Sequence, residues 1–539
     1  MSAQDFRATL TGRILDPSGA AVPSVTVEVR NVGTNEVTTV VADAEGRYIA
    51  PLLRPGAYRV SVEAPGFKKF IREGVVLEIS QVARVDIKLE VGALTEQVTV
   101  TADAPLLEAS TSSIGRVVDN RRILELPLNT RNVYSLVVLT PGITGSIGEW
   151  HDGMNWSAYG TRRRTMDILI DGATASQPTV TGYSAVSVFP SVDAIQEFKV
   201  TGANVPAEYG RTLGTVLNVV YKSGTNAFHG SAYDFLRNSE FDANNFFANT
   251  RGEKLQTFQR NQFGGVVSGP IRRSKTFFMG SYEGLRERRF SSTTTSMPTL
   301  LEREGDFSQT LAGANRLVTV YDPFTTRANP SGSGFIRDAF SGNKIAPGRM
   351  DAVGRNVLKY YPLPNQPGDA YTQKNNYSRS GSASVNTDNY DVRVDHNLSD
   401  TQKLLARYSK RHLEDVPAIL FPREITIAEG RIVNTNWNHH AVAEHSYTLS
   451  PTTVLTSRLG FSRNLFPYQN QGVGFLPSTL GLPSIIDRYT DQVMFPRIEA
   501  AGYASLGHRD HRRSTSNTFS ASASLAQTRG SHTLKYGFE

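Results

Sequence analysis

The N-terminal part of the chain alternates apolar and polar residues in short runs. "ATLTGRILDP" and "VTVEVRN" are period-two runs rich in Val, Ile and Thr, and "GRYIAPLLRPGAYRVSVEAPGF" adds two more, joined through "RPG". The turn sequences "DPSG" and "DAEG" separate the runs, because Asp binds its own backbone and Gly accepts positive φ. Short strands at this regular spacing predict an immunoglobulin-like β-sandwich over residues 1–92.

A short extended segment follows the sandwich. Residues 93–112 form a linker rich in Gly, Ala, Ser and Pro around the alternating heptapeptide "EQVTVTA". An extended segment on a tether is suited to β-augmentation, in which its backbone pairs with the edge of a partner's sheet. The same pattern fits an ordinary last strand of the sandwich, and the residues alone leave both interpretations open.

Residues 113–226 change to a mixed pattern. "VDNRRILELPL" predicts a helix capped by Asp119 or Asn120, and the helical spacing in "NTRNVYSLVVLTPGI" predicts a second helix capped by Asn129 and Thr130. "MDILIDGATA" predicts a strand that ends in an Asp-Gly turn, and "VDAIQEFKVTGA" and "GTVLNVVYKSGTN" predict two more strands. These elements indicate a compact α/β domain.

From residue 227 to 539, alternating strands are separated by long polar stretches. In "YDVRVDHN" the Tyr and Val residues share one face and the Asp and Arg residues share the other. "VLTSRLGFS" repeats this, with Leu459 and Phe461 opposite Arg458 and Ser462. Repeated strands with one apolar and one charged face are typical of an outer-membrane β-barrel, apolar toward lipid and polar toward the lumen. A soluble β-sandwich array has the same period, so periodicity does not decide between them.

Charge and cysteine content narrow the function classes. Lys and Arg number 57 and Asp and Glu number 50, so the net charge is +7, spread thinly along the chain. This distribution lacks the basic face with stacking aromatics that nucleic-acid binding needs. The chain has no Cys, which excludes disulfides, zinc–thiolate sites and cysteine nucleophiles. No run approaches the roughly 18 apolar residues of a spanning helix, so a membrane crossing would require a closed barrel.

Two groups of motifs resemble known families. "TGRILDPSGAAVPSVTVEV" and "DAEGRYIAPLLRPGAYRVSVEAPGF" resemble the carboxypeptidase regulatory-like domain, a carbohydrate-binding-like sandwich. "LPLNTRNVYSLVVLTPGI", "MDILIDG" and "VSGPIRRSKTFFMGSYEGLRER" resemble TonB-dependent outer-membrane receptors of the Oar-like group, as does the long stretch that begins "SVDAIQEFKVTGANVPAEYGRTLGTVLNVVYKSGTN". The order of the parts fits that group over essentially the whole chain.

The resemblance implies a mainly β protein with three structured parts. They are a sandwich over 1–92, an α/β plug domain over 113–226, and the first part of a transmembrane antiparallel β-barrel over 227–539. It implies a TonB box in the linker 93–112, for which "EQVTVTA" is the best match. The box residues would be Glu96, Gln97, Val98, Thr99, Val100, Thr101 and Ala102.

Ligand contacts are expected in the plug. The stretch "IGEWHDGMNWSAYGTRRR" mixes aromatic and basic residues, a combination suited to sugars or anionic groups, although such residues also pack against a barrel wall. The candidate contacts are Trp150, Trp156, Tyr159, Arg162, Arg163 and Arg164.

Catalytic and metal-binding patterns are weak. In "HHAVAEH" the spacing is one residue too long for H-x-x-E-H, and His440 and Glu444 would share a strand face that His445 does not. Asp43 and Glu45 could be read as calcium ligands, but turn chemistry explains Asp43 equally. P-loop, G-x-S-x-G and dinucleotide motifs are missing from the sequence. We therefore expect no enzyme activity, no cofactor and no metal site.

The function expected from the sequence is import of a bulky solute across the outer membrane. A saccharide, peptide or metal chelate would pass through the plugged barrel, driven by TonB, with the plug and sandwich on the periplasmic side. A surface binding or adhesion protein without import is the alternative. Barrels of this family close with about 22 strands, more than residues 227–539 supply at roughly 10 residues per strand. The strand-like end "GSHTLKYGFE" and the lack of a visible signal peptide therefore suggest a fragment of a longer protein.

Overall fold

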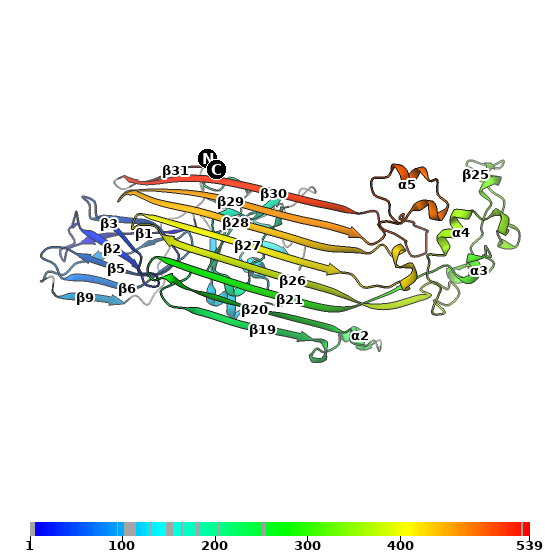
Figure 1. The fold of residues 1–539 in the computed structure, drawn as a ribbon, viewed down its shortest axis with the longest axis horizontal. Helices are drawn as coiled ribbons and strands as arrows, with labels where there is room; N and C mark the ends of the chain where they lie inside the picture. Colours follow the sequence, from blue (N-terminus) through cyan, green and yellow to red (C-terminus); the bar gives the residue numbers. More distant parts are fainter. Residues whose placement is uncertain are drawn as a thin grey trace.

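The chain folds into three parts that pack against one another (Figure 1). They are a two-layered β-sandwich, a central α/β domain and a long nine-stranded sheet. The computed structural model describes residues 6–93, 95–101, 115–126, 128, 131–146, 155–162, 165–178, 184–202, 204–212, 214–250, 252, 254–529 and 532–539.

The sandwich consists of two sheets around one apolar core. One sheet has the order β4-β1-β7, with β8 also pairing with β1, and the other has the order β3-β2-β5-β6-β9. Alternate residues such as Val27, Val29, Val60 and Val62 point inward and are fully buried, as the period of two requires. The strands are β1 (Ala8–Leu15), β2 (Thr26–Asn31), β3 (Val37–Val41), β4 (Arg47–Leu53), β5 (Gly56–Glu63), β6 (Lys69–Leu77), β7 (Val82–Arg84), β8 (Ile87–Lys88) and β9 (Gln97–Thr101).

The central domain contains a five-stranded mixed sheet. Its order is β10-β17-β18-β13-β14, with β13 and β18 parallel and the other pairs antiparallel. β13 and β18 are buried at every position, as expected of strands covered on both faces. The strands are β10 (Gly115–Asp119), β11 (Ile143–Ser146), β12 (Asn155–Ala158), β13 (Asp167–Ile170), β14 (Ala173–Thr174), β15 (Ser176–Pro178), β16 (Ser184–Val186), β17 (Ile195–Thr201) and β18 (Val216–Tyr221).

The helices of the central domain follow the predicted signals, with one difference. Helix α1 (Asn120–Glu125) is capped by Asp119, whose side chain accepts from the backbone N–H of Arg122. The second helical segment, η1 (Val133–Leu139), is a 3₁₀ helix capped by Asn132, not an α-helix. The predicted caps Asn129 and Thr130 lie outside the described residues. A short 3₁₀ turn, η2 (Val192–Ala194), precedes β17.

The C-terminal part forms one antiparallel sheet in sequence order. Its strands run β19-β20-β21-β26-β27-β28-β29-β30-β31, each hydrogen-bonded to the next along the chain. The strands are β19 (His229–Asn238), β20 (Phe258–Arg272), β21 (Thr276–Thr295), β26 (Tyr377–Asn397), β27 (Gln402–Val416), β28 (Ile432–Ser450), β29 (Thr453–Asn470), β30 (Arg512–Arg529) and β31 (His532–Phe538).

Connections at the two ends of this sheet differ in length. Tight turns at 273–275, 398–401 and 451–452 close one end, whereas the connections 239–257, 296–376, 417–431 and 471–511 extend from the other. Figure 1 shows the sandwich at the end with tight turns and the long connections at the opposite end. The connections carry η3 (Ser239–Phe241), α2 (Phe246–Thr250), α3 (Leu300–Arg303), β22 (Leu311–Ala312), η4 (Gly313–Asn315), β23 (Arg316–Leu317), η5 (Pro323–Thr325), β24 (Arg327–Ala328), β25 (Phe335–Ile336), η6 (Ser341–Asn343), η7 (Pro347–Arg349), α4 (Ala352–Leu358), η8 (Arg423–Ala428), η9 (Pro477–Leu480) and α5 (Ile485–Tyr489).

The two faces of the nine-stranded sheet are inverted relative to a water-soluble sheet. The inner face, which contacts the central domain, carries charged side chains such as Arg393 and Arg458, which are 2% and 4% exposed. The outer face carries large apolar side chains such as Leu459 and Phe519, which are 63% and 77% exposed. The predicted alternation is thus observed, with the apolar face outward. Among the helices that the structure describes, none is both long and apolar enough to cross a membrane.

Candidate functional site at the domain interfaces

A tight turn of the central domain places a carboxylate against the inner face of the sheet. Asp171 follows β13 and, with Gly172, adopts positive φ values of 48° and 77°, the backbone of the Asp-Gly turn predicted from "DILIDG". The Asp171 carboxylate is fully buried. One oxygen accepts from Arg393 Nη1 at 3.0 Å and the other from Arg407 Nε at 2.7 Å. The turn is therefore held by two guanidinium groups from β26 and β27.

A second carboxylate links this pair to the sandwich. Arg393 also donates to both oxygens of Asp395, at 2.9 and 3.1 Å. Asp395 in turn pairs with Arg54 of the sandwich, whose Nη1 lies 2.7 Å away. Near the tight turns, Lys403 of β27 pairs with Glu36 of the sandwich. A continuous chain of alternating charges therefore joins all three parts of the molecule.

The other side of the Asp171 turn rests on a second ion pair of the inner face. Arg458 of β29 donates to Glu444 of β28 at 2.5 and 3.0 Å and to the carbonyl oxygen of Gly172 at 3.2 Å. A Cβ atom at Gly172 would lie 2.4 Å from Arg458 Cζ. Arg7, just ahead of β1, reaches Glu444 at 3.5 Å and donates to the Thr456 hydroxyl at 2.6 Å. The start of the sandwich thus reaches into the same network.

Further hydrogen bonds complete the polar network. Asp391 accepts from the hydroxyl groups of Tyr221 and Ser409, at 2.8 and 2.5 Å. The His440 ring lies between Arg407, 2.8 Å from its Nδ1, and the carbonyl oxygen of Thr174, 3.2 Å from its Nε2. Desolvating so many charges is costly, and removing one partner of a buried pair costs about 3–5 kcal/mol. The main effect of the network is therefore to fix one docked position of the central domain. Its net contribution to the free energy of unfolding is small.

A separate contact joins the sandwich to the central domain. Phe6, Ile79 and Val220 form a small buried apolar cluster. Beside it, Glu197 of β17 accepts a hydrogen bond from the backbone N–H of Ile79. Burial raises the pKa of Glu197 to about 8, and the bond from Ile79 only partly offsets this. The carboxyl group is therefore neutral in the docked state at neutral pH and below.

The heptapeptide 96–102 lies at the edge of the sandwich. Its residues Gln97–Thr101 form β9, which pairs in parallel with β6. Val98 is half-buried and the other four residues of β9 are exposed. β9 ends the order of its sheet, so its outer backbone edge has no partner strand among the described residues. Glu96 precedes the strand and forms an ion pair with Lys68 at 3.3 Å, whereas Ala102 lies outside the described residues.

The aromatic and basic candidates of the central domain separate into different environments. Trp156 is 1% exposed and belongs to the domain core, where its indole N–H contacts the sulfur of Met166. Tyr159 is half-buried and packs against the same core. Arg162 is exposed. The remaining candidates, Trp150, Arg163 and Arg164, lie outside the described residues.

The ionic interface was only partly visible in the sequence. The alternation predicted that Arg393 and Asp395 share the polar face, but it did not indicate what they contact. Asp171 was explained by turn chemistry alone, although its carboxylate also binds two arginines. The "HHAVAEH" stretch divides as expected, with His440 and Glu444 buried on the inner face and His445 on the outer face. The described residues hold no cluster of three acidic or histidine side chains suited to a metal ion.

Comparison with known proteins adds the family. Residues 9–90 match the carboxypeptidase regulatory-like domain, and residues 220–539, more than half of the chain, match the outer membrane beta barrel domain. The TonB-dependent transporter Oar of Myxococcus xanthus is 27% identical over 289 residues, which are 51% of this chain and 26% of that protein.

Solved structures show a looser similarity. The outer membrane transporter YddB from Escherichia coli gives a TM-score of 0.47 at 10% identity, over 78% of this chain and 47% of that one. A ferric enterobactin receptor from Pseudomonas aeruginosa gives 0.41 at 12% identity, over 80% and 49%. The chain thus spans about a quarter of the curated relative and about half of these two structures. By its family match, the chain belongs to the outer membrane β-barrel family, as a homologue of the TonB-dependent transporter Oar with an N-terminal carboxypeptidase regulatory-like domain.

Proposed function

We propose that the chain takes part in TonB-dependent import of a bulky solute across the outer membrane, and that it is not an enzyme. In this proposal residues 113–226 are the plug and residues 227–539 are part of the barrel. The observation that carries the proposal is the buried contact of Asp171 with Arg393 and Arg407, because it seats the central domain against a charged inner wall.

The chemistry of this contact suits a plug that must move. A domain held by an apolar core would expose that core to water on leaving its seat. Charged and hydroxyl groups instead exchange their partners for water, so that a hydrogen bond contributes about 0.5–1.5 kcal/mol net, or about 1.5–3 kcal/mol where one group is charged. The seat is therefore specific in position, and water entering the interface can replace its contacts one by one.

TonB is the proposed partner, and β9 is its proposed docking strand. The edge position of β9 leaves one backbone edge open for a further strand, as β-augmentation requires. The sandwich lies at the end of the sheet with tight turns, and in outer-membrane barrels the short turns face the periplasm. In this proposal β9 faces the periplasm, from which TonB would reach it, and the outer face of the sheet meets the membrane lipid.

The solute would be a saccharide, a peptide or a metal chelate. Among the candidate contacts, Arg162 has an exposed side chain, and its guanidinium group suits an anionic or hydroxyl-bearing ligand. Trp150, Arg163 and Arg164 remain candidates on sequence grounds. Trp156 and Tyr159 would act through the packing of the plug around such a ligand.

Disulfide cross-linking tests the partner directly, because the chain has no cysteine of its own. Single-cysteine variants at Gln97 and Thr99 should cross-link to cysteines placed along the box-binding strand of TonB in intact cells. Thr39→Cys is a matched control, because Thr39 is exposed on β3, the strand at the opposite edge of the same sheet. Equal cross-linking at Thr39, or none at β9, would favour the alternative of a surface binding or adhesion protein without import.

A further inference from the structure

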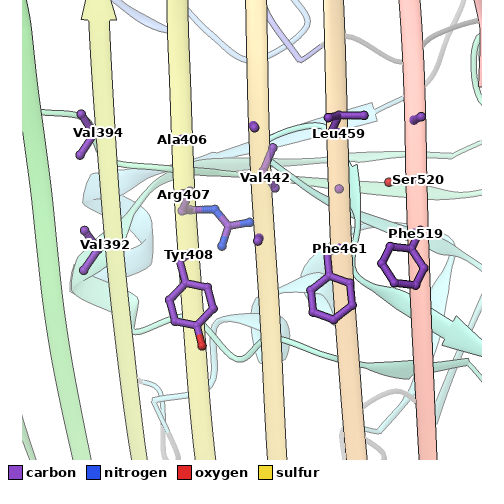
Figure 2. A pocket seen from close by; sticks show the side chains of 14 residues that line it. Val392, Val394, Ala406, Arg407, Tyr408, Val442, Leu459, Phe461, Phe519 and Ser520 are labelled. Carbon is purple, nitrogen blue, oxygen red and sulfur yellow. The ribbon is translucent and has the colours of Figure 1, made fainter.

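The outer face of the nine-stranded sheet contains an apolar groove. Its lining includes the small side chains of Ala406, Ala443 and Ala521. The bulkier Tyr408, Phe461 and Phe519 stand along one side (Figure 2). The cavity volume is about 670 Å³, within the range of about 300–1,000 Å³ found for small-molecule sites. The groove crosses β26 to β30 and is continuous with the exposed apolar surface around it.

A row of basic side chains borders the groove. Lys410 is paired with His439, and His439 with Arg463, across β27, β28 and β29. Each residue is two positions from the aromatic side of the groove, toward the long connections, and therefore lies on the same face. Neighbouring strands are about 4.8 Å apart, so the three bases lie within reach of one anionic group.

The row has no acidic partner among the described residues. Lys410 Nζ lies 5.2 Å above the Trp437 ring, and His439 Nδ1 is 2.7 Å from the Tyr408 hydroxyl. The charged groups that act on His439 are Lys410 and Arg463, both positive. Arg463 is exposed and has no ion pair within 4.0 Å in the described part of the chain.

The first acidic side chain beyond the row has other partners. The next outward carboxylate, Asp388, is hydrogen-bonded to Arg286 at 2.7 Å and to the Tyr282 hydroxyl at 2.8 Å. Aromatic rings lie at the level of the row and just beyond it: Tyr282 and Tyr390 pack with ring centroids 5.1 Å apart, and Trp437 lies nearby. Aromatic residues of this kind concentrate where a membrane protein passes from lipid to water. The basic row therefore lies where lipid headgroups would be.

We infer that the groove and the basic row form a binding site for a phosphorylated membrane lipid. An acyl chain would lie in the groove, and the phosphate would be held by Lys410, His439 and Arg463. Charge complementarity and continuity with the apolar band favour this occupant over a protein partner, because basic clusters at a membrane surface attract anionic headgroups. The inference relies on the outer face meeting lipid, but not on import or on TonB.

Native mass spectrometry of the purified full chain in nanodiscs would test the inference. The nanodiscs would be phosphatidylcholine containing a small fraction of lipid A, with or without its phosphates. We expect one retained lipid A per chain, dependent on the phosphates. Each basic residue near a membrane surface contributes about fivefold to binding, so K410Q/R463Q should weaken retention by about 25-fold. R513Q is the matched control, because Arg513 is also exposed, on β30, but lies outside the row.

Two further variants separate a site from general attraction. Ala443→Trp should fill the groove and reduce retention while the basic row stays intact. K410R/R463K should retain the lipid, because it keeps both positive charges at the same positions. Equal retention of lipid A without phosphates, or unchanged retention in K410Q/R463Q, would overturn the inference. Displacement of lipid A by inorganic phosphate alone would also overturn the inference. So would a dimer of two chains that forms without lipid and that Ala443→Trp prevents.

Discussion

At the scale of single residues, Asp171 has the largest predicted effect. Asp171→Asn removes the charge that two buried guanidinium groups share. Leaving Arg393 and Arg407 without it should destabilise the docked central domain by about 3–5 kcal/mol. Guanidinium unfolding followed by tryptophan fluorescence measures this, because Trp150 and Trp156 both belong to that domain.

An exposed ion pair provides the comparison. Asp338 pairs with Arg327 at 2.7 Å in a long connection, and both side chains are more than half exposed. Asp338→Asn should change stability by less than about 1 kcal/mol, because surface pairs contribute little. Equal effects of the two substitutions would show that the Asp171 contact is no stronger than a surface pair.

Gly172 tests the fit of the same turn. Gly172→Ala would place a methyl group on a left-handed residue and 2.4 Å from Arg458 Cζ. We expect a loss of about 1–3 kcal/mol, as for other overpacked sites, measured by the same unfolding assay. If Gly172→Ala costs less in an Arg458→Ala background than in the parent chain, the clash contributes to the loss, whereas an equal loss in both backgrounds would assign it to backbone strain at Gly172 alone.

Glu197 gives the contact between sandwich and central domain a pH dependence. Its pKa is about 8 when docked, raised by burial from the ordinary value of 4.5. Between these values the folded state keeps a proton that the unfolded chain releases, so this contribution to stability falls as the pH rises from about 4.5 to 8. Proteolysis of the linked domains should therefore be slower at pH 5.5 than at pH 8. Glu197→Gln should flatten this profile, and an unchanged profile in the variant would assign it to other groups.

At the scale of elements, β9 has two backbone edges with different roles. The C=O of Glu96 accepts from the N–H of Lys69 in β6. Because successive residues of a strand point their backbone groups to opposite edges, Val98 should face β6 and Thr99 the open edge. Thr99→Pro is expected to abolish cross-linking of a Gln97→Cys variant to TonB while the sandwich stays paired. If Thr99→Pro has no effect on cross-linking, the open edge is not the docking surface.

Element types were predictable where a local signal determines them. Asp119 caps α1 as its position before "NRRIL" suggests. The type of η1, a 3₁₀ helix capped by Asn132, was not predictable. Over seven residues, the spacing of apolar side chains does not distinguish a 3₁₀ helix from an α-helix. For β9, the sequence was compatible with a free peptide and with a last strand of the sandwich. In the structure β9 forms a parallel hydrogen-bonded pair with β6, and Glu96 beside it forms an ion pair with Lys68. The alternation of residues alone does not specify either contact.

At the scale of the whole molecule, the alternation of residues predicted the faces but not the partners. The alternation with period two identifies the polar face of β26. Asp391 and Asp395 are an even number of residues apart, so their side chains point to the same face. That Arg54 would meet Asp395, or that Arg7 would meet Glu444, depends on contacts across hundreds of residues. Such pairings are set by how three domains pack, and no local pattern encodes them. The lipid-facing assignment likewise needed the family, because a soluble sheet has the same period.

The proposed import requires the central domain to move away from the inner face of the nine-stranded sheet. Thiol labelling in cells measures this movement most directly. Ser187 is 1% exposed and its hydroxyl lies 2.7 Å from that of Ser462 on the inner face. In a Ser187→Cys variant the only thiol is therefore shielded while the domain is docked. Ser331→Cys, exposed between β24 and β25 in the long connection 296–376, is the control for access of the reagent. We predict labelling of Ser187→Cys by a membrane-impermeant reagent that rises several-fold in energised cells with TonB, and not in cells that lack TonB or are uncoupled. Labelling that is equally slow in all three would contradict TonB-driven movement and leave a binding role without import.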